Sequence, residues 1–354
     1  MTLRVCEYLN FFFFTLSLII TRTQANTATR VIKALEVLNE AYHYNVECKI
    51  KGDIGEKEPC LPQICSRHVL DGVFVDDDIK ALHTIAKKGM SSRGMSQGGP
   101  TILDINTGFI RDSKGLENLF TRDASSKIFT DEDFGVYGKI ITKLKETVTS
   151  TMGATELYFT APTFITRLDG SAEWNPSEIH DEYWHPHADR NNTPHYHYSG
   201  LLYMSTKDDD FTGGDLVLYD ADSGQDRPKS QDDIDKAMVG IKFFDEEQLR
   251  IEPRAGRVVI FSSGHENPHK VERVLSGQRF VLAFWFTCDK RRAFQVFLDG
   301  AAHSAFSEEF ADDLKKKAGH SEVPTQRPET AAAKKRRRRK SNSGGPRAEN
   351  DAEL

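Results

Sequence analysis

The sequence has no long hydrophobic run and no excess of positive charge. Its longest apolar stretch runs from Leu9 to Ile20, which is shorter than the ~20 residues that a membrane-spanning helix needs. The formal net charge of the 354 residues is −6, and leaving out the seven successive cations of residues 334–340 lowers it to −13. A folded part with this acidic balance lacks the basic surface of a nucleic-acid-binding protein.

Residues 1–25 have the pattern of a secretory signal. One arginine at position 4 precedes the apolar stretch, and small or polar residues follow it to Ala25. The pattern predicts a signal peptide cleaved after Ala25, with an uncleaved signal anchor in the membrane as the alternative. The final residues 351–354, Asp-Ala-Glu-Leu, resemble a retention signal of the endoplasmic reticulum but differ from it at the first two positions. We therefore expect the protein in the lumen of the endoplasmic reticulum.

The chain has five cysteines, and removal of the signal peptide takes Cys6 away. The remaining Cys48, Cys60, Cys65 and Cys288 are an even number in an oxidising compartment, where disulfides form. Cys60 and Cys65 would close a short loop, and they are the first expectation for a bond. The sequence alone does not fix the pairing.

Residues 26–150 are expected to be a mainly helical region with a cysteine-containing linker. Apolar residues recur at helical spacing over residues 27–42. The segment 76–89 begins with three aspartates and ends with two lysines and a glycine, which suits the helix dipole and a helix stop. A third helix, with acids in its first turn, is expected over residues 130–149.

Short apolar strands separated by turn signals dominate residues 151–292. Such a series predicts an antiparallel sandwich or barrel. A charged segment at 220–248 interrupts the series, and we expect a disordered insertion or a lid there. The expected strands are 157–168, 183–188, 197–205, 215–219, 249–252, 257–261, 269–274 and 280–287.

Two candidate metal ligands stand two residues apart in one of these strands. His187 and Asp189 belong to Trp-His-Pro-His-Ala-Asp-Arg at 184–190, and on a strand such a pair leaves the same face. The best third ligand is His269, about eighty residues later. Two imidazoles and one carboxylate form the facial triad that binds non-haem Fe(II) and leaves coordination positions open.

Arg279 follows His269 by ten residues and begins an apolar run, up to Phe286, that is typical of a buried strand. A buried guanidinium is costly unless it meets an anion, and its planar fork suits a carboxylate. Arg279 is therefore a candidate for binding an acidic co-substrate. The inference depends on the joint spacing of these residues, because any one of the twelve histidines is more often a surface or core residue.

Two other metal-site patterns occur in the sequence. The pairs at 185–187 and 195–197 have the His-x-His of a cupin, but neither is followed by the glutamate that a cupin site needs. The range His265–His269 matches His-Glu-x-x-His, the zinc metalloprotease signature, which requires both histidines on one helical face. Pro268 would break that helix, and the preceding residues favour a strand. The protease is therefore a remote alternative.

Longer strings carry a family resemblance that covers roughly residues 45–290. They are His-Asp-Glu-Tyr-Trp-His-Pro-His-Ala-Asp-Arg at 180–190, Glu-Pro-Arg-Ala-Gly-Arg at 252–257, Asn-Pro-His-Lys-Val-Glu at 267–272 and Phe-Thr-Cys at 286–288. The order His-x-Asp, His and Arg in these surroundings is similar to the prolyl 4-hydroxylase-like branch of the Fe(II)/2-oxoglutarate-dependent dioxygenases. Within that branch it resembles the 2-oxoglutarate and iron-dependent oxygenase domain-containing protein 3 family.

The resemblance implies a double-stranded β-helix, or jelly roll, braced by the N-terminal helices. It implies that His187, Asp189 and His269 bind Fe(II), that 2-oxoglutarate and O2 are co-substrates, and that ascorbate keeps the iron reduced. Arg279 and Tyr203 would bind the far carboxylate of 2-oxoglutarate, with simple packing as the alternative role for Tyr203. The implied reaction hydroxylates a protein side chain, prolyl or lysyl, and releases succinate and CO2.

Three further features concern access and partners. Asn191 begins an N-glycosylation sequon beside the metal pair. Aspartates 208–210 and Asp215, together with the segment 220–248, are expected to form an acidic rim that attracts basic peptides. Residues 293–354 comprise a helix remnant and a basic tail with too little apolar area to fold.

The main alternative function is a non-catalytic module on the same fold that binds peptides. The presence of all four residues His187, Asp189, His269 and Arg279 argues against it. For the protease alternative, a substitution of Glu266 would abolish activity while one of Asp189 would not. The dioxygenase predicts the reverse.

Overall fold

The structure is a computed structural model. It describes residues 29–48, 60, 65–93, 99–119, 128–154, 156–160, 163–171, 174–175, 183–220 and 247–294. The expected signal peptide, most of the segment 220–248 and the tail beyond residue 294 lie outside the described residues. Within them, no helix is long and apolar enough to cross a membrane.

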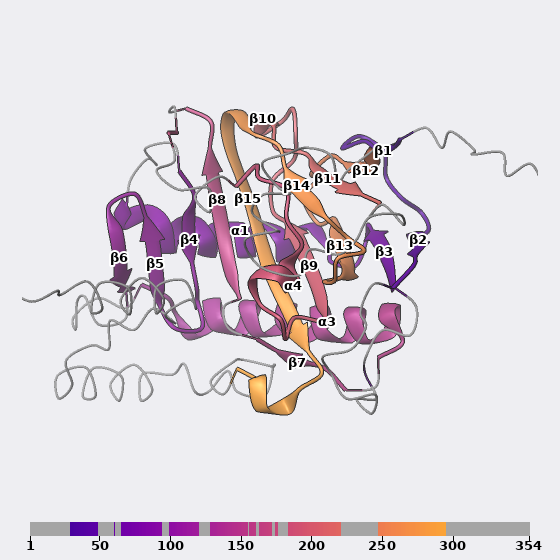
Figure 1. The fold of residues 1–354 in the computed structure, drawn as a ribbon. Coiled ribbons are helices and arrows are strands. Elements are labelled where there is room, and N and C mark those ends of the chain that lie inside the picture. Colours follow the sequence, from indigo (N-terminus) through magenta and orange to yellow (C-terminus); the bar gives the residue numbers. More distant parts are fainter. Residues whose placement is uncertain are drawn as a thin grey trace, which may run out of the picture.

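Two β-sheets form the centre of the molecule (Figure 1). The smaller sheet has four strands, in the order β1 (Arg30–Ile32), β12 (Glu247–Ile251), β11 (Leu216–Tyr219) and β14 (His269–Val271). The larger sheet runs β2 (Tyr42–Val46), β3 (Cys65–Leu70), β13 (Val258–Ser262), β9 (Tyr198–Tyr203), β15 (Val274–Thr287), β8 (Phe164–Asp169), β4 (Thr101–Leu103), β5 (Phe109–Asp112) and β6 (Gly115–Asn118). Two short strands, β7 (Tyr158–Phe159) and β10 (Phe211–Gly213), pair with β15.

The chain winds between the two sheets from β8 to β15. It passes from β8 to an isolated bridge at His187 in the smaller sheet, returns to β9, and crosses again to β11 and β12. It then alternates through β13, β14 and β15, so that β15 lies between β8 and β9. This winding is the double-stranded β-helix, which confirms the expected fold.

Two long helices cover the outer face of the larger sheet (Figure 1). The helix α1 (Asp76–Met90) has aspartates in its first turn and lysines in its last, and α3 (Asp131–Met152) begins with a capping box between Thr130 and Asp133. Their positions confirm two of the three expected helices. Their apolar faces bury residues such as Leu82 and Ile141 against the sheet, which is the packing that stabilises an amphipathic helix.

Alternation along the strands produces two separate hydrophobic cores. On β15, Phe280, Leu282 and Phe284 face the helices, whereas Val281 faces the smaller sheet and packs with residues such as Phe261. Successive strand residues point to opposite faces, so each strand of the larger sheet serves both cores. Polar residues on the inner face are therefore enclosed between the sheets.

The helix expected over residues 27–42 is wrong. Residues 30–32 form β1, which pairs in parallel with β12, and β2 begins at Tyr42. The hydrogen bonds of Arg257 to the carbonyl groups of Lys33 and Glu36 hold the intervening segment against the core. Leu35, which helical spacing would have buried, is 86% exposed. Pairing with a strand more than two hundred residues away is invisible to local periodicity.

The expected disulfide between Cys60 and Cys65 is also wrong. The structure has two bonds, Cys48–Cys65 and Cys60–Cys288. The antiparallel pairing of β2 with β3 brings Cys48 beside Cys65, with the Cα atoms 5.0 Å apart. The other bond joins the segment before β3 to the residue that follows β15. The first pairing follows from neighbouring strands, and the second joins residues 228 positions apart that meet only in the folded structure.

Candidate metal centre

His187 and His269 lie opposite each other at the open edge of the smaller sheet. The two residues exchange both backbone hydrogen bonds, N–H to C=O, at 2.9 and 2.8 Å. Their ring centres are 4.5 Å apart. Asp189 joins them, and one potential ligand atom from each of the three residues lies within 4.8 Å of the others. The structure thus brings together the three residues that the sequence singled out.

The two imidazoles are oriented in the same way. Each Nδ1–H donates to a backbone carbonyl two residues earlier, His187 to His185 at 2.9 Å and His269 to Asn267 at 3.1 Å. A carbonyl oxygen only accepts, so these bonds fix the proton on Nδ1 and leave Nε2 with its lone pair. Such contacts to the non-ligating nitrogen orient metal-binding histidines.

Asp189 is held from its far side. Ser199, on β9, donates its hydroxyl to Oδ2 of Asp189 at 2.6 Å, and the Ser199 hydroxyl also contacts that of Ser263 at 2.7 Å. Oδ1 is left facing the two imidazoles, 3.5 Å from Nε2 of His187 and 3.8 Å from Nε2 of His269. The serines were not identified from the sequence, because nothing in their spacing links them to Asp189.

The strand expected at 183–188 is wrong in extent. Only His187 makes a bridge, and Asp189 begins the short helix α4 (Asp189–Asn192). The two side chains therefore converge through a turn from bridge to helix, and not along one strand face. Asn191 lies in α4 and is half-buried, and its glycosylation stays a prediction.

The carboxylate and the imidazoles shift one another's pKa values. Burial alone would raise the pKa of Asp189, but His269, His187 and the Ser199 hydroxyl lower it well below its usual value. Burial lowers the pKa of His269 to about 4. Burial would also lower the pKa of His187, but the hydrogen bond and charge of Asp189 raise it above 6.5. An ionised carboxylate beside a neutral His269 is the protonation state that a divalent metal requires.

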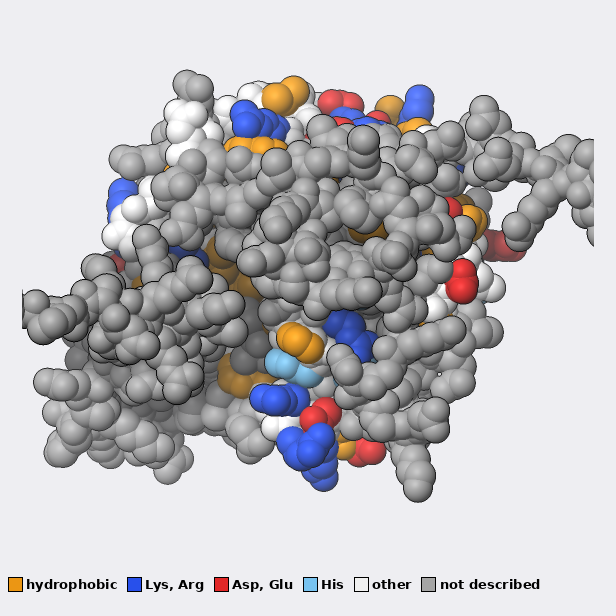
Figure 2. All heavy atoms as spheres, viewed as in Figure 1, with side chains coloured by type: hydrophobic (Ala, Val, Ile, Leu, Met, Phe, Trp, Pro, Cys, Tyr) orange, Lys and Arg blue, Asp and Glu red, His pale blue; other side chains and the backbone are white. Residues whose placement is uncertain are grey.

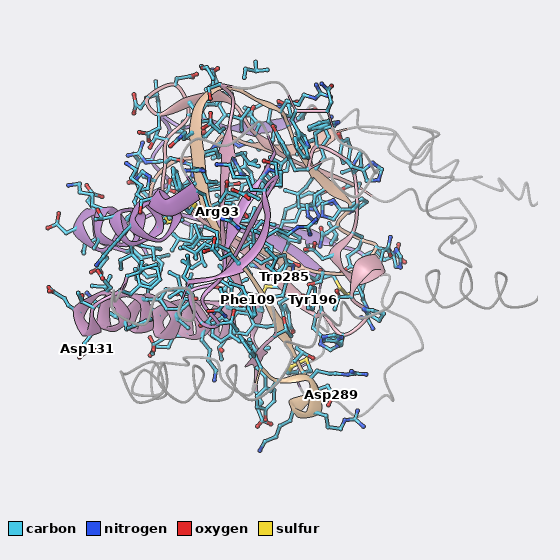
Figure 3. All side chains as sticks on the ribbon, turned by 90° about the vertical axis from the view of Figure 1, so that its left-hand side faces the viewer. Arg93, Phe109, Asp131, Tyr196, Trp285 and Asp289 are labelled. Atoms are coloured by element: carbon cyan, nitrogen blue, oxygen red, sulfur yellow. A yellow bond between two sulfur atoms is a disulfide. The ribbon has the colours of Figure 1, made fainter. Side chains whose placement is uncertain are left out.

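A cavity of about 270 Å³ adjoins these three residues and reaches Arg279. Its walls are mainly apolar and include Phe164, Phe261, Val281 and Trp285. Trp285 stacks on Tyr196 with ring centres 5.3 Å apart, and the two are labelled side by side in Figure 3. On the face shown in Figure 2, described hydrophobic side chains lie in hollows beside a histidine and several Lys and Arg side chains.

Arg279 and Tyr203 form the other end of this region. Arg279 is 1% exposed and Tyr203 is fully buried, with the guanidinium carbon 5.2 Å from the centre of the Tyr203 ring. Among the described residues, Nε and Nη2 of Arg279 and the hydroxyl of Tyr203 have no hydrogen-bond partner. Burial lowers the pKa of Arg279 and raises the pKa of Tyr203, and the interaction between the two side chains opposes both shifts. These two guanidinium nitrogens and the hydroxyl are buried, and together they fit an anion with two oxygens, such as a carboxylate.

Gly214 shapes the space around the guanidinium. Its φ is +70°, a conformation that side-chain-bearing residues rarely adopt, and a Cβ built there would lie 2.9 Å from Cδ of Arg279. Gly213 also has a positive φ, +75°, and a Cβ built there would lie 2.2 Å from the carbonyl oxygen of Arg273, so both positions require glycine.

The donor set fits Fe(II) and a dicarboxylic keto acid. One nitrogen of each imidazole and one carboxylate oxygen lie within 4.8 Å of one another, and two histidines with one carboxylate are the ligand set of non-haem Fe(II) sites with open positions. The buried guanidinium, with unmatched donors, lines the same cavity. A ligand that both chelates the metal and carries a second carboxylate would satisfy both ends.

The structure contradicts the zinc metalloprotease alternative and removes one residue, Asp215, from the expected acidic rim, whose Asp208, Asp209 and Asp210 are exposed. His265 is exposed and lies in a turn, so the helix that a zinc metalloprotease signature needs is not formed. Asp215, expected in an acidic rim, is 3% exposed and makes ion pairs with Lys207 and Arg250 at 2.9 and 3.1 Å. Its charge is thus neutralised within the fold and does not contribute to a surface field.

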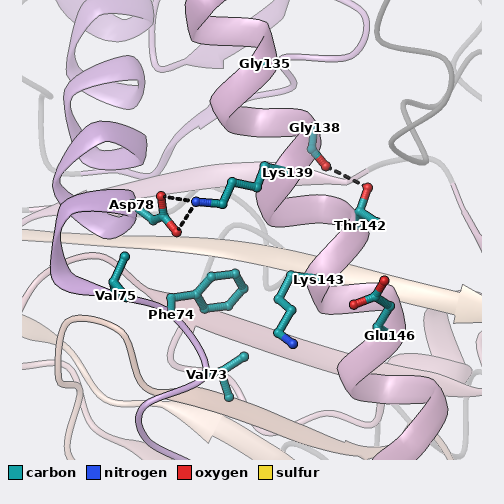
Figure 4. A pocket seen from close by; sticks show the side chains of 10 residues that line it. All are labelled: Val73, Phe74, Val75, Asp78, Gly135, Gly138, Lys139, Thr142, Lys143 and Glu146. Atoms are coloured by element: carbon teal, nitrogen blue, oxygen red, sulfur yellow. Dashed lines mark hydrogen bonds and ion pairs between the residues drawn. The ribbon is translucent and has the colours of Figure 1, made fainter.

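A second hollow, of about 710 Å³, lies on the opposite side of the larger sheet (Figure 4). It is bordered by the start of α1 and by α3, and its charged lining includes the ion pair of Lys139 with Asp78 at 2.8 Å. Its lining residues, all within the described part of the chain, include no histidine or cysteine. This hollow is the larger of the two, but the candidate metal ligands and Arg279 line the smaller cavity.

Comparisons with known proteins agree with this geometry. Residues 175–287 match the family model of the 2OG-Fe(II) oxygenase superfamily. The rat protein called 2-oxoglutarate and iron-dependent oxygenase domain-containing protein 3 is 36% identical over 236 residues, which are 66% of this chain and 66% of the rat protein. The Xenopus tropicalis protein of the same name is 33% identical over 240 residues, 67% of each chain.

Two further similarities are narrower. Rat prolyl 3-hydroxylase 2 is 38% identical over 92 residues, which are 26% of this chain and 10% of that protein. A solved prolyl hydroxylase from Trichoplax adhaerens, in complex with a hypoxia inducible factor peptide fragment, has a TM-score of 0.41 and 14% identity. The match covers 64% of this chain and 85% of that one.

Proposed function

The chain belongs to the 2OG-Fe(II) oxygenase superfamily, and from that membership we propose that it hydroxylates a side chain of a protein substrate. The observation that carries the proposal is the shared cavity of His187, Asp189, His269 and Arg279. A metal triad alone would suit many reactions. The buried, unmatched guanidinium in the same cavity selects a carboxylate co-substrate, and 2-oxoglutarate is the co-substrate of the family.

Each residue has a defined task in this reaction. His187, Asp189 and His269 would hold Fe(II), and their backbone and serine contacts orient the ligand atoms before the metal arrives. Arg279, with the Tyr203 hydroxyl, would bind the far carboxylate of 2-oxoglutarate. Bound Fe(II) with 2-oxoglutarate and O2 supplies the oxidant for C–H hydroxylation, with succinate and CO2 as the other products. The apolar walls exclude water from the reacting centre.

The lining of the cavity favours a prolyl over a lysyl side chain as the target. Phe164, Phe261 and Trp285 offer apolar surface to the substrate side chain, whereas among the described residues Asp189 is the one acidic side chain in the cavity lining that could meet a lysine ammonium. The name of the similar rat protein, prolyl 3-hydroxylase 2, points to the same residue type. Hydroxylation of a peptidyl proline is therefore the specific form of the proposal.

The proposed compartment is the lumen of the endoplasmic reticulum, with ascorbate as the reductant that keeps iron active. Two disulfides support an oxidising compartment, because cytosolic thiols are kept reduced. Secretion of a reporter fused to residues 1–30, with N-terminal sequencing of the product, tests both the location and cleavage after Ala25. A reporter that stays in the cytosol would reject this part of the proposal.

The central experiment measures succinate formed from 2-oxoglutarate by the purified full chain with Fe(II), ascorbate, O2 and a library of proline-containing peptides. We expect iron-dependent turnover that Asp189→Ala and Arg279→Ala abolish. His265→Ala is the matched control, because this exposed histidine lies close in sequence to His269 but outside the cavity. Iron binding without turnover on any peptide would favour the non-catalytic module, and absence of iron binding would reject the triad.

A further inference from the structure

Arg67 occupies an unusual place for an arginine. It lies on β3, outside the strands that wind between the sheets, and its side chain has no exposed surface. In the pairing of β3 with β13 it stands opposite Phe261, a residue that lines the cavity. Burying a guanidinium costs free energy unless its donors are met. The identity of its partners therefore tells what the residue does.

The partners of Arg67 lie on two segments, the loop just before β14, which carries His269, and the end of the neighbouring strand β11. Nε donates to the Oδ1 atom of Asn267 at 2.7 Å, and Nη2 donates to the carbonyl oxygens of Tyr219 at 2.5 Å and Glu266 at 3.3 Å. Nη1 pairs with Asp220 at 2.8 Å. One planar group thus joins the end of β11 to the loop that leads into β14.

Asn267 connects this guanidinium to the candidate metal ligand. Its Nδ2 donates to the backbone carbonyl and the hydroxyl of Ser262, each at 2.9 Å, and Asn267 is 1% exposed. Its own backbone carbonyl accepts the Nδ1–H of His269 at 3.1 Å. The orientation of the His269 ring therefore depends on where the Asn267 peptide is held, and Arg67 holds the side chain of that residue.

We propose that Arg67 is a positioning residue for the metal centre, acting through Asn267 to fix the ring of His269. The inference rests on the proposed function in one respect, that His269 binds the metal. It assigns a role to a residue more than two hundred positions away in the sequence that does not itself reach the metal.

The shape of the guanidinium explains why arginine stands here. Nε and Nη2 of its planar fork reach three acceptors in different directions, while Nη1 forms an ion pair with Asp220. A lysine ammonium at this position keeps the charge but reaches fewer of them. Arg67→Lys is therefore expected to retain the fold and loosen the loop that carries Asn267.

The test measures Co(II) binding to the metal-free full chain by visible absorption, without turnover. We expect Arg67→Lys to weaken Co(II) binding by about ten- to a hundredfold, the usual loss for a residue that orients a ligand, and to alter the absorption band. Arg167→Lys is the matched control. That arginine is 6% exposed and lies on β8 with Ile165 on the helix side of the sheet, where it bonds to Thr101. Its substitution should leave Co(II) affinity within about twofold of wild type.

A double-mutant cycle separates positioning from general loosening. In a His269→Ala background, residual Co(II) binding through His187 and Asp189 should not weaken further when Arg67→Lys is added. A further loss of the same size would overturn the proposal, because Arg67 would then act on the whole centre. Asn267→Ala serves if Arg67→Lys does not fold. It should also weaken binding, and wild-type affinity in this variant would equally overturn the proposal.

The outcome is distinct from that of the proposed function. If the wild-type chain binds no Co(II), the metal centre itself fails and the proposed function fails with it. If wild type binds Co(II) and Arg67→Lys binds it equally well, only the positioning role is rejected.

Discussion

The two ends of the cavity are built on opposite principles. At the metal end, the non-ligating atom of each side chain is satisfied by the protein: Nδ1 of His187 and of His269 by carbonyl groups, and Oδ2 of Asp189 by Ser199. At the arginine end, Nε and Nη2 of Arg279 and the hydroxyl of Tyr203 have no partner among the described residues. The first end thus presents oriented atoms that can bind a metal ion, and the second presents donors that can bind an anion.

The difference shows where each end draws its free energy. The metal ligands are oriented by bonds that exist before the metal binds, so binding costs little ordering. The guanidinium of Arg279 is 1% exposed, and burial of its charge costs free energy that a bound anion can offset. A carboxylate that offsets this cost binds more tightly than it would to an exposed arginine. The cost of burying an uncompensated charge therefore falls on the Arg279 end of the cavity and not on the end with the candidate metal ligands.

Asp189→Ala should have the largest effect. It removes a ligand atom and leaves the Ser199 hydroxyl without its acceptor, so iron binding and turnover should fall by more than about a hundredfold, beyond the range of changes that only orient ligands. Anaerobic Fe(II) titration and succinate formation measure both. His265→Ala should retain both values. Turnover that survives in Asp189→Ala would remove the metal end from the mechanism.

Arg279→Met should affect catalysis and stability in opposite directions. The KM for 2-oxoglutarate should rise by roughly 30-fold or more, since truncating one member of a buried charge pair costs about 2–5 kcal/mol. The metal-free, ligand-free protein should become more stable by roughly 1–4 kcal/mol, because an unmatched buried charge is replaced by an apolar group. Urea unfolding tests this sign. A destabilised variant would show that Arg279 is already neutralised in the empty protein.

The pH dependence should distinguish the two ends. The pKa of His187 is raised above 6.5 by Asp189, so its imidazole still carries a proton where a free histidine is neutral. Metal affinity should therefore increase about tenfold per pH unit up to that pKa and level off above it, as one proton is displaced. The pKa of His269 is about 4, so it adds a second proton only in acid. Calorimetry at pH 5–8 tests this.

The same pH series supplies the contrast for the arginine end. Arginine stays protonated throughout this range, although burial lowers the pKa of Arg279. Affinity of the metal-free protein for 2-oxoglutarate should therefore stay constant from pH 6 to 8. A slope like that of metal binding would indicate that a histidine takes part in holding the keto acid.

Tyr203→Phe should have the smallest effect. Loss of one hydrogen bond should weaken 2-oxoglutarate binding by about two- to tenfold, for a contribution of roughly 0.5–1.5 kcal/mol. Stability of the empty protein should not fall, because the hydroxyl has no partner there. Tyr198→Phe is the matched control on the same strand. Its hydroxyl donates to the Cys60 carbonyl at 2.6 Å, so this change should lower stability and leave 2-oxoglutarate affinity unaltered.

Local signals predicted much of the fold correctly. The acids and the stop residues of α1 and α3 lie within a few positions of each helix end, and both helices formed where expected. Alternating apolar strands predicted the double-stranded β-helix once the family resemblance was added. The expectation of a mainly helical region over residues 26–150 was wrong, because the structure places the strands β1 to β6 there beside α1 and α3. The short strand β10 was also missed, because Phe211–Gly213 is too brief to show alternation.

Local sequence signals also identified part of the candidate site. His187 and Asp189 stand two residues apart, and Arg279 begins an apolar run in which a guanidinium is expected to be buried and to need an anion. The supporting residues Ser199, Ser263, Arg67 and Asn267 were not found. Each is a common residue type whose role depends on a contact with a strand far away in the sequence, and no local pattern records such a contact.

By itself, the sequence determined which side chains are the candidate metal ligands, because ligand type and short spacing are properties of neighbouring residues. Only the tertiary structure decided the pairing of the cysteines, the joining of β1 to β12, and the link from Arg67 through Asn267 to His269. These depend on segments that meet when two sheets close on one another. The free energy that stabilises these long-range contacts comes from burying the apolar faces of both sheets together, which is a property of the whole chain.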